Sequence, residues 1–206
     1  MRLHRQIPAT RAEGPGLRYT LWVQGCRNGC PGCYATDLWD PAGGYEVSPE
    51  EVLRQIRETP GIEGVTFLGG EPMEQARDLV RVARGARDLG LSVLTFTGLT
   101  YEYLLAEGTP DQAQLLRLTD LLIDGPFLRE QQDYSRPWVG SRNQRYLFLT
   151  DRYGPEDIDA CRNRVELRLD RDGTLRLNGM GDFAALERIL QNKTFMRGNE
   201  DGIHKL

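Results

Sequence analysis

The sequence predicts an α/β fold in which parallel strands alternate with helices, followed by a smaller unit near the C-terminus. Short runs of β-branched and apolar residues that end in glycine alternate along the chain with segments of helical hydrophobic spacing. The order strand–helix–strand–helix implies parallel strands joined by right-handed crossovers. Near the C-terminus, apolar and polar residues instead alternate around Asp172-Gly173, which is typical of a β-hairpin.

The first predicted elements lie on either side of a cysteine-rich loop. Leu17–Gly25 (LRYTLWVQG) is predicted to be a strand, because it is rich in β-forming residues and ends in glycine. A helix follows over 48–59, with Ser48 as its N-cap and Pro49 in its first turn. Further strands are predicted over 64–70 (GVTFLGG), 91–98 (LSVLTFTG), 120–127 (DLLIDGPF) and 144–150 (QRYLFLT). Further helices are predicted over 74–90, 100–108 and 110–118.

The chain divides into a core over 1–150 and a C-terminal annex over 151–206. Within the annex we predict a hairpin over 165–178, a short amphipathic helix over 182–190 and a frayed tail after it. One face of the hairpin is apolar and consists of Val165, Leu167, Leu169, Leu175 and Leu177. Because a two-stranded hairpin is marginally stable alone, this face must pack on something. We expect it to pack on the core of the chain, and a partner protein is the alternative.

The composition limits the classes of protein to consider. The chain has 206 residues and a net charge of −4, which gives no bulk electrostatic attraction to nucleic acid. No apolar run approaches the roughly 20 residues of a membrane span. The first residues, MRLHRQIPATRAEG, lack the apolar core of a secretory signal. We therefore expect a cytoplasmic protein with neither a membrane nor nucleic acid as its partner.

Three cysteines, Cys26, Cys30 and Cys33, lie in the loop over 25–36 with the spacing C-x3-C-x2-C. In a cytoplasmic chain such a cluster indicates metal binding or redox chemistry rather than disulfides. Thiolates are soft ligands that select zinc, copper(I) or iron–sulfur clusters. A [4Fe–4S] cluster held by only three cysteines keeps one iron open to a substrate or cofactor. The glycines between the cysteines allow the backbone to wrap closely around a bulky centre.

Two simpler interpretations of the cysteines stay open. A structural zinc site needs a fourth ligand, for which Cys161, His4 and His204 are the remote candidates. Alternatively, the three cysteines are buried and bind nothing. Cys161 lies in a polar helical stretch, EDIDACRNR, where we expect it to be a bystander, and neither histidine is assigned any chemistry.

Glycine-marked loops follow four of the predicted strands. The cysteine loop follows the first strand, GGEP (69–72) the second, TG (97–98) the third and DGP (124–126) the fourth. In parallel α/β sheets the carboxyl ends of the strands meet at one edge, where sites form. We therefore expect the four loops to share one rim.

The cysteine spacing followed by Tyr34, together with GGEP, resembles the two motifs of the radical S-adenosylmethionine (SAM) superfamily. The resemblance implies that the three cysteines hold a [4Fe–4S] cluster and that SAM chelates the open iron. An electron from the cluster then splits SAM into methionine and a 5′-deoxyadenosyl radical. The cofactor contacts that we expect on this basis are Tyr34, Gly69, Gly70, Glu71, Pro72, Thr97, Gly98 and Asp124.

Several of these positions also have a purely structural interpretation. Glu71 could stabilise the positive start of the following helix, and the TG stretch could be an ordinary strand-ending turn. Asp124 could cap a helix or accept a backbone hydrogen bond, and Tyr34 could be buried in the core. Arg18 is expected to orient the cysteine loop or to pair with an acid, with a surface ion pair as the alternative.

A longer stretch, EGPGLRYTLWVQGCRNGCPGCYATDLW (13–39), is similar to the opening of the anaerobic ribonucleotide reductase activating proteins. TDLLIDGPF and GSRNQRYL resemble later segments of the same family. The resemblance implies an incomplete (β/α) barrel of about six units. It also implies a glycyl-radical enzyme that gives up hydrogen from a glycine, and a flavodoxin- or ferredoxin-like reductant.

The chain departs from that family in two respects, and other functions therefore stay open. Ala35 stands where the family usually has Asn, and the annex extends beyond the compact activating proteins. One alternative is a radical SAM enzyme that acts on another protein, a peptide or a small molecule. An alternative of another class is a non-enzymatic zinc or iron–sulfur binding module.

Overall fold

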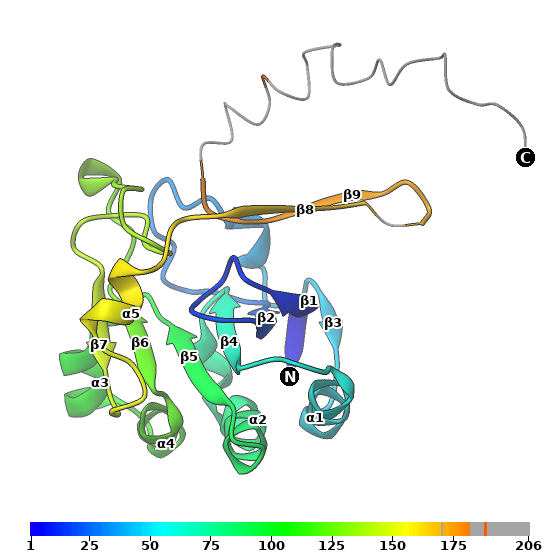
Figure 1. Cartoon of the computed structure of the whole chain (residues 1–206). Helices are drawn as coiled ribbons and strands as arrows, with labels where there is room; N and C mark the ends of the chain where they lie inside the picture. The colour runs from blue at the N-terminus through cyan, green and yellow to red at the C-terminus, as the bar shows by residue number, and fades with distance from the viewer. Residues whose placement is uncertain (170, 182–187, 189–206) are drawn as a thin grey trace, which may run out of the picture.

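A mixed β-sheet forms the centre of the protein in a computed structural model that describes residues 1–169, 171–181 and 188. Its strands are β1 (Arg2–Thr10), β2 (Arg18–Val23), β3 (Tyr45–Glu46), β4 (Gly64–Gly69), β5 (Ser92–Phe96), β6 (Leu121–Asp124) and β7 (Arg145–Phe148). The strand order is β3-β1-β2-β4-β5-β6-β7 (Figure 1). A separate two-stranded hairpin contains β8 (Val165–Leu169) and β9 (Leu175–Gly179).

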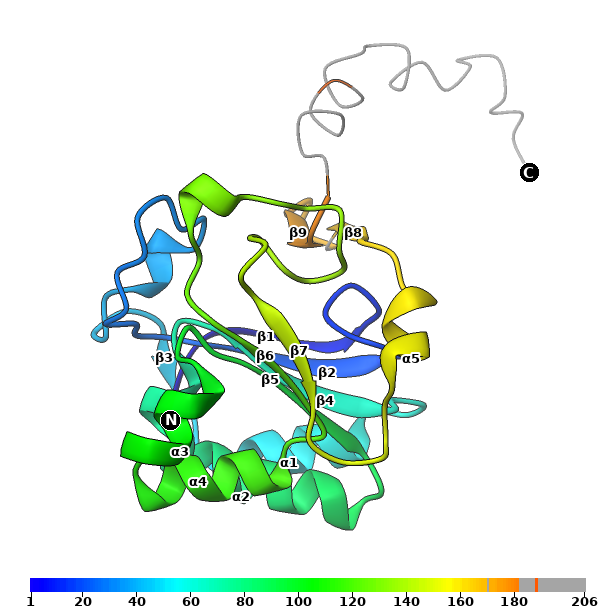
Figure 2. The ribbon, with the colours of Figure 1, turned by 90° about the vertical axis from the view of Figure 1, so that its left-hand side faces the viewer.

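The helices of the crossovers lie together on one face of the sheet. They are α1 (Pro49–Glu58), α2 (Ala76–Asp88), α3 (Tyr101–Glu107) and α4 (Pro110–Leu118). Figure 2 shows these four helices on one side of the strands, with the hairpin on the other. A short helix, α5 (Pro155–Asp159), leads into the hairpin, and three short 3-10 turns lie in the loops at Thr36–Leu38, Pro72–Gln75 and Arg129–Gln131. Every helix within the described ranges is too short or too polar to cross a bilayer.

The four central strands confirm the predicted parallel arrangement, whereas the strands at the edges do not. β2, β4, β5 and β6 pair in parallel, each joined to the next by a helical crossover. β7 is antiparallel to β6, which corrects the prediction of a parallel strand there. The connection between them has only a 3-10 turn, so the chain returns without a crossover helix. β1, which pairs antiparallel with β2, was not anticipated from the sequence.

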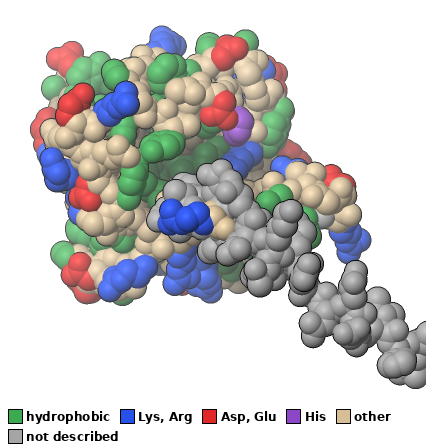
Figure 3. Space-filling view, turned by 90° about the horizontal axis from the view of Figure 1, so that it is seen from above, with side chains coloured by type: hydrophobic (Ala, Val, Ile, Leu, Met, Phe, Trp, Pro, Cys, Tyr) green, Lys and Arg blue, Asp and Glu red, His purple; other side chains and the backbone are tan. Residues whose placement is uncertain are grey.

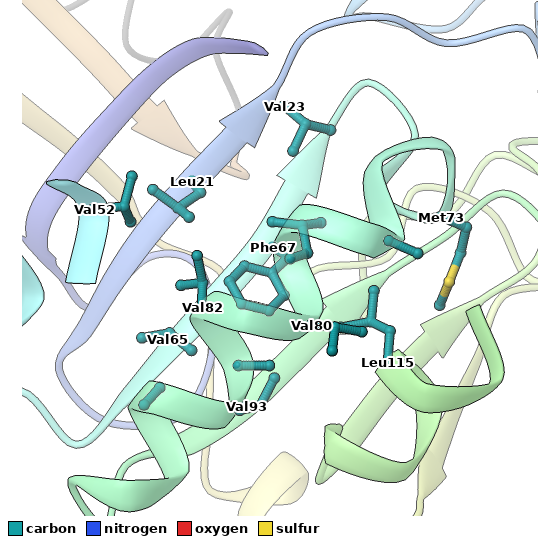
Figure 4. Close-up of a cluster of buried hydrophobic side chains, with 14 of the residues drawn as sticks. Leu21, Val23, Val52, Val65, Phe67, Met73, Val80, Val82, Val93 and Leu115 are labelled. Atoms are coloured by element: carbon teal, nitrogen blue, oxygen red, sulfur yellow. The ribbon is translucent and has the colours of Figure 1, made fainter. Parts of the chain in front are cut away.

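Alternate residues of the central strands build an apolar core against the helices. Leu21, Phe67 and Val93 are fully buried on this side of the sheet. Residues of α2, including Val82, pack on them, as Figure 4 shows. We call this side the helix face. Successive side chains of a strand point to opposite faces, so the residues in between must lie on the other side of the sheet.

The opposite side carries both apolar and polar residues, and we call it the cavity face. Arg18, Trp22, Thr66, Leu68 and Phe96 lie on it. Arg18 is completely buried and donates hydrogen bonds to Thr66 Oγ1 at 2.6 Å, Ser92 Oγ at 3.0 Å and the Tyr153 hydroxyl at 3.0 Å. These contacts tie the start of β2 to its neighbours rather than to the cysteine loop. The expectation that Arg18 orients the cysteine loop or pairs with an acid is therefore wrong, and so is the alternative of a surface ion pair, because its hydrogen-bond partners are hydroxyls and carbonyls inside the protein.

The hairpin forms where the sequence predicts it. Leu167 pairs with Leu177 and Leu169 with Leu175, and the turn contains Gly173 with a positive φ of 85°. The predicted short helix over 182–190 and the tail lie, apart from position 188, outside the described residues.

The hairpin is hydrogen-bonded to the rest of the chain mainly through its polar face, and of its leucines only Leu177 is partly buried. Glu166 accepts hydrogen bonds from Thr10 Oγ1 and the Arg11 N–H, both at 2.7 Å. Asn178, directly opposite Glu166 in the pair, donates to Thr10 Oγ1 at 3.0 Å. Leu167, Leu169 and Leu175 are 45%, 71% and 45% exposed. The expectation that the apolar face packs on the core is thus wrong for these three leucines, because the strands present their opposite face to the loop after β1.

Candidate functional site

A cavity of about 400 Å³ lies on the cavity face, at the carboxyl ends of the parallel strands. Its floor contains Trp22, Leu68, Phe96 and Ile123, one residue from each of the four central strands. Seen from above, hydrophobic side chains gather in a hollow on this side of the molecule (Figure 3). Its wall includes Cys26, Cys30, Cys33, Tyr34, Gly69, Gly70, Glu71, Thr97, Gly98 and Gly125. Parts of the cysteine, GGEP, TG and DGP loops therefore meet around one space.

The cysteine loop is held at both ends by backbone hydrogen bonds. The N–H groups of Gly25 and Cys26 donate to the carbonyls of Leu38 and Trp39 at 2.8 and 3.2 Å. Within the loop, the Cys33 N–H donates to the Cys30 carbonyl at 3.1 Å, closing a turn through Gly32, whose φ is +80°. A residue with a side chain would be strained at that φ. The three thiols are free of disulfides and partly buried.

The geometry bears on which centre the cysteines can hold. Among residues 1–169, 171–181 and 188, no three His, Cys, Asp or Glu side chains converge on a point that could hold one metal ion. Cys161 packs beside another cluster, with Ile158 and Tyr146, and His4 lies 3.6 Å from Asp37. Neither is placed to complete a zinc site with the loop, and His204 lies outside the described residues.

A four-iron cluster makes a different demand on its ligands. Each iron takes a single thiolate, so the cysteines must surround a space rather than meet at one point. Cys26, Cys30 and Cys33 line the same cavity, and soft sulfur ligands suit iron–sulfur centres. The donor set and its placement therefore fit a [4Fe–4S] cluster. Burial, together with the nearby charges of Glu71 and Glu74, raises the pKa of the Cys26 thiol, so metal binding there would release a proton.

Glu71 joins three parts of the rim. Its Oε1 accepts from the Met73 N–H at 2.9 Å and the Thr97 hydroxyl at 2.8 Å. Its Oε2 accepts from Asn28 Nδ2 at 2.7 Å and the Gly98 N–H at 2.8 Å. A carboxylate has about four acceptor positions, and these donors use them. The side chain is 1% exposed, and burial raises its pKa.

The glycines of the rim allow backbone to cross backbone. A Cβ on Gly70 would lie 2.2 Å from the Gly25 carbonyl oxygen, and a Cβ on Gly98 would lie 2.4 Å from Asn28 Nδ2. The Glu71 N–H donates to the same Gly25 carbonyl at 2.8 Å. Gly70 is therefore required for the GGEP loop to lie against the cysteine loop, whatever ligand binds nearby.

Two predicted site residues, Pro72 and Asp124, do not line the cavity. Pro72 is buried at the start of a 3-10 turn that Glu71 caps. Asp124 is fully buried and accepts from the Tyr101 N–H at 2.7 Å and Arg145 Nε at 2.9 Å. Its neighbour Ile123 lies on the cavity face, so Asp124 lies on the helix face. Its contacts match the backbone hydrogen bond that we gave as the alternative role.

Tyr34 is at the surface end of the site. It is 77% exposed, so the alternative of burial in the core is wrong. Its ring makes an edge-on contact with Tyr134, with the ring centres 6.2 Å apart.

Trp138, which the sequence analysis missed, also lines the cavity. Its φ of +61° lies in the left-handed region, which is strained for a bulky residue. Asn163 holds this conformation, because its Oδ1 accepts from the Trp138 N–H at 2.9 Å. Its Nδ2 donates to the carbonyls of Tyr134 and Arg136 at 2.8 and 3.0 Å. No motif marks this arrangement, which depends on contacts between distant loops.

A second missed group comes from β1, the loop after it, and the hairpin. Arg5, Glu13 and Asn178 line one side of the cavity. The Arg5 guanidinium lies 4.2 Å from the centre of the Trp22 ring, and its Nη1 donates to the Leu177 carbonyl at 2.9 Å. Glu13 Oε1 accepts from Asn178 Nδ2 at 3.2 Å, and burial raises the pKa of Glu13. The sequence of β1 gives no clear strand signal, because three polar residues separate Leu3 from Ile7 and Pro8 follows.

Comparison with known proteins identifies relatives of the chain. The model of a family described as a 4Fe-4S single cluster domain matches residues 12–147. An anaerobic ribonucleoside-triphosphate reductase-activating protein of Vibrio cholerae is 33% identical over 156 residues, which cover 70% of this chain and 96% of the relative. The protein of the same name from Escherichia coli K12 is 30% identical over 152 residues, with the same two coverages. The protein of the same name from Enterobacteria phage T4 is 29% identical over 158 residues, which cover 73% of this chain and 96% of the relative.

One solved structure shows a weaker likeness. It is QueE from Escherichia coli, with a TM-score of 0.39 and 22% identity, and the match covers 47% of this chain and 52% of that one. A likeness of this size carries no argument about fold or function.

Proposed function

The chain belongs to the 4Fe-4S single-cluster family, and to the same family as the anaerobic ribonucleoside-triphosphate reductase-activating proteins, and on this premise we propose that it is itself a radical SAM activating enzyme. Its macromolecular substrate is an anaerobic ribonucleoside-triphosphate reductase, from which it abstracts hydrogen at a glycine. The observation that carries the proposal is the meeting of Cys26, Cys30 and Cys33 with the GGEP and TG loops around one cavity.

In this proposal the three cysteines hold a [4Fe–4S] cluster, and SAM binds beside it. Cys26, Cys30 and Cys33 would hold the cluster, which with SAM would supply one-electron reductive chemistry and the means of hydrogen abstraction. The chain contributes the binding space and excludes water from it. The floor of Trp22, Leu68, Phe96 and Ile123 is suited to that task, because water in the cavity would allow side reactions.

The rim contributes mostly backbone groups to SAM. We assign Gly69, Gly70, Thr97 and Gly98 to contacts with SAM, because all four line the cavity beside the cysteines. Glu71 acts as a positioning residue, since its acceptor positions are used by the chain itself. It holds the GGEP, TG and cysteine loops in one arrangement. Tyr34 is assigned to the open end, beside the cluster and the adenine of SAM.

The fold and the reductant complete the proposal. In this proposal the parallel strands β2, β4, β5 and β6 belong to an incomplete barrel of about six units. Antiparallel β1 and β7 flank these four strands in the sheet. The reductant is a small flavodoxin- or ferredoxin-like protein. Arg27, beside Cys26, pairs with Glu74 at 3.4 Å, but its side chain is 89% exposed and so stays open to such a partner near the cluster.

Anaerobic reconstitution of the full chain with iron and sulfide tests the enzymatic activity. We expect a brown, air-sensitive protein that, once reduced, converts SAM to 5′-deoxyadenosine and methionine. A colourless protein that binds zinc and leaves SAM intact would contradict the proposal and favour a non-enzymatic metal-binding module.

A further inference from the structure

The cavity opens to solvent beside the cysteine loop. Of the described residues that line the cavity, Tyr34 is the only exposed one, with 77% of its surface accessible. The loop over 125–142 borders the same opening, because Tyr134 also lines the cavity and meets the Tyr34 ring edge-on. A polypeptide that reaches into the cavity at this opening therefore passes both tyrosines.

Gln132 lies beside the two rings, and we call Tyr34, Gln132 and Tyr134 the aromatic lip. Gln132 Nε2 donates to the Tyr134 hydroxyl at 2.7 Å and lies 3.5 Å from the Tyr34 hydroxyl. Asn163 fixes the backbone of Tyr134 from the annex, since its Nδ2 donates to the Tyr134 carbonyl at 2.8 Å. Tyr134 is therefore held in place before any partner arrives, which lowers the entropy that binding costs.

The chemistry of the aromatic lip suits a neutral polypeptide segment. Its two rings and one amide carry no charge at neutral pH, and burial raises the pKa of Tyr134 to about 12. Tyrosines offer an apolar face together with a hydroxyl, and they are enriched where proteins bind one another. Their rigid rings supply contact area for peptide units and small side chains such as those around a glycine. A nucleotide or another highly charged ligand finds no counter-charge within the lip.

We propose that the aromatic lip is the contact surface for the substrate polypeptide, with Tyr134 as its central residue. The rings of Tyr34 and Tyr134 pack on the segment that carries the reacting glycine, at the point where this segment enters the cavity. This role of the lip rests on the proposed function and deepens it, because it identifies the surface that the reductase meets. Tyr34 thereby has two neighbours, SAM on the cavity side and the polypeptide on the solvent side.

Calorimetry with the full-length, anaerobically reconstituted protein tests the lip. An anaerobic ribonucleoside-triphosphate reductase is titrated into it with SAM present and reductant absent, so that no turnover occurs. We expect Tyr134→Ala to weaken the affinity for the reductase about tenfold or more, the effect typical of a central aromatic residue in an interface. Tyr134→Phe should weaken it less than about threefold, because the ring remains and the exposed Gln132 amide binds water instead.

Tyr103→Ala is the matched control. Tyr103 is also an exposed tyrosine, at 50%, but it belongs to α3 on the helix face (Figure 2), so its loss should leave the affinity unchanged. Equal affinities of the wild type and Tyr134→Ala overturn the proposal, and an equal loss in Tyr103→Ala does the same. An equal loss in Tyr134→Phe also overturns it, because the ring would then contribute nothing. If Tyr134→Ala binds the reductase normally but its cluster is reduced more slowly by a reduced flavodoxin, the lip serves the reductant instead.

SAM cleavage by the reduced wild type is measured separately, without the reductase. A wild type that leaves SAM intact contradicts the proposed function, whereas a reductase affinity that depends on the Tyr134 ring still supports the lip. A wild type that cleaves SAM, together with a Tyr134→Ala variant that binds the reductase as tightly, overturns the lip alone. No binding of the reductase by the wild type overturns the lip and the choice of substrate together. The failures are therefore distinguishable.

Discussion

The helix face and the cavity face of the central sheet are made by alternate residues of the same strands, yet their chemistry differs. Leu21, Phe67 and Val93 on the helix face are completely buried in a mostly apolar core. On the cavity face the same strands carry Trp22, Leu68 and other residues that border an open space. Polar groups are rare on the first face and frequent on the second, where Arg18 and Thr66 are buried with hydrogen-bond partners.

The difference shows that stability and function are divided between faces rather than between segments of the chain. Burial of one large apolar side chain contributes about 1.5–3 kcal/mol, and the helix face has many of them. The cavity face keeps unfilled space and partly buried thiols, which contribute little to stability. Substitutions on the two faces should therefore have different consequences even at adjacent positions.

The largest expected effect is the loss of iron from the cavity face with little loss of stability. Cys26→Ala, Cys30→Ala and Cys33→Ala should each remove nearly all cluster iron after reconstitution. The free energy of unfolding of each apoprotein should lie within about 0.5 kcal/mol of the value for the wild-type apoprotein, since the thiols are only partly buried. Iron assays and urea titrations measure the two quantities. Cys161→Ala is the matched control, and iron loss in that variant would refute the assignment of the ligands.

Adjacent residues of β4 provide the next comparison. Phe67→Ala should lower the free energy of unfolding by about 3–5 kcal/mol, because it leaves a cavity in the helix-face core. Leu68→Ala, on the partly buried cavity face, should cost about 1–2 kcal/mol. Urea denaturation of both variants gives the values. Equal losses of unfolding free energy in the two variants would show that both faces of the sheet contribute equally to the stability of the fold.

The smallest expected effect concerns Glu71, which joins the GGEP, TG and cysteine loops at the rim. Glu71→Gln replaces one acceptor oxygen with a donor. When that oxygen is Oε2, the Gly98 N–H and Asn28 Nδ2 both lose their acceptor, at a cost of about 1–3 kcal/mol. Amide hydrogen exchange at Gly98 should become faster. Glu74→Gln is the control, because Glu74 also holds the cysteine loop, through the Arg27 N–H at 2.9 Å, but in a more exposed place. If Glu74→Gln speeds amide hydrogen exchange at Gly98 as much as Glu71→Gln does, Glu71 has no special role at the rim.

The sequence predicts those parts of the molecule that depend on local pattern. Glycine-ended apolar runs identify the four parallel strands, and the loops that follow them meet at one rim because parallel strands share a direction. The spacing of the cysteines marks the proposed cluster ligands. These features need no knowledge of which distant segments pair.

The remaining features depend on which distant strands pair and on which face of the sheet each residue lies. β7 is antiparallel because its connection lacks a crossover helix, and no strand pattern shows this. Asp124 lies one residue from the cavity face and therefore points away from it. The hairpin presents Glu166 and Asn178 to the chain, although its leucines are the stronger sequence signal. Arg5 and Asn178 meet only because both segments fold over the same cavity.

We propose that the cavity face, once it holds a cluster and SAM, abstracts hydrogen from a glycine of a partner protein. The most direct test is electron paramagnetic resonance of an anaerobic ribonucleoside-triphosphate reductase mixed with the reconstituted chain, SAM and a reductant. We predict a glycyl-radical signal on the reductase that requires SAM and is absent when Cys30→Ala replaces the wild type. A reductase that stays free of radical while the chain forms 5′-deoxyadenosine at full rate would contradict the claim.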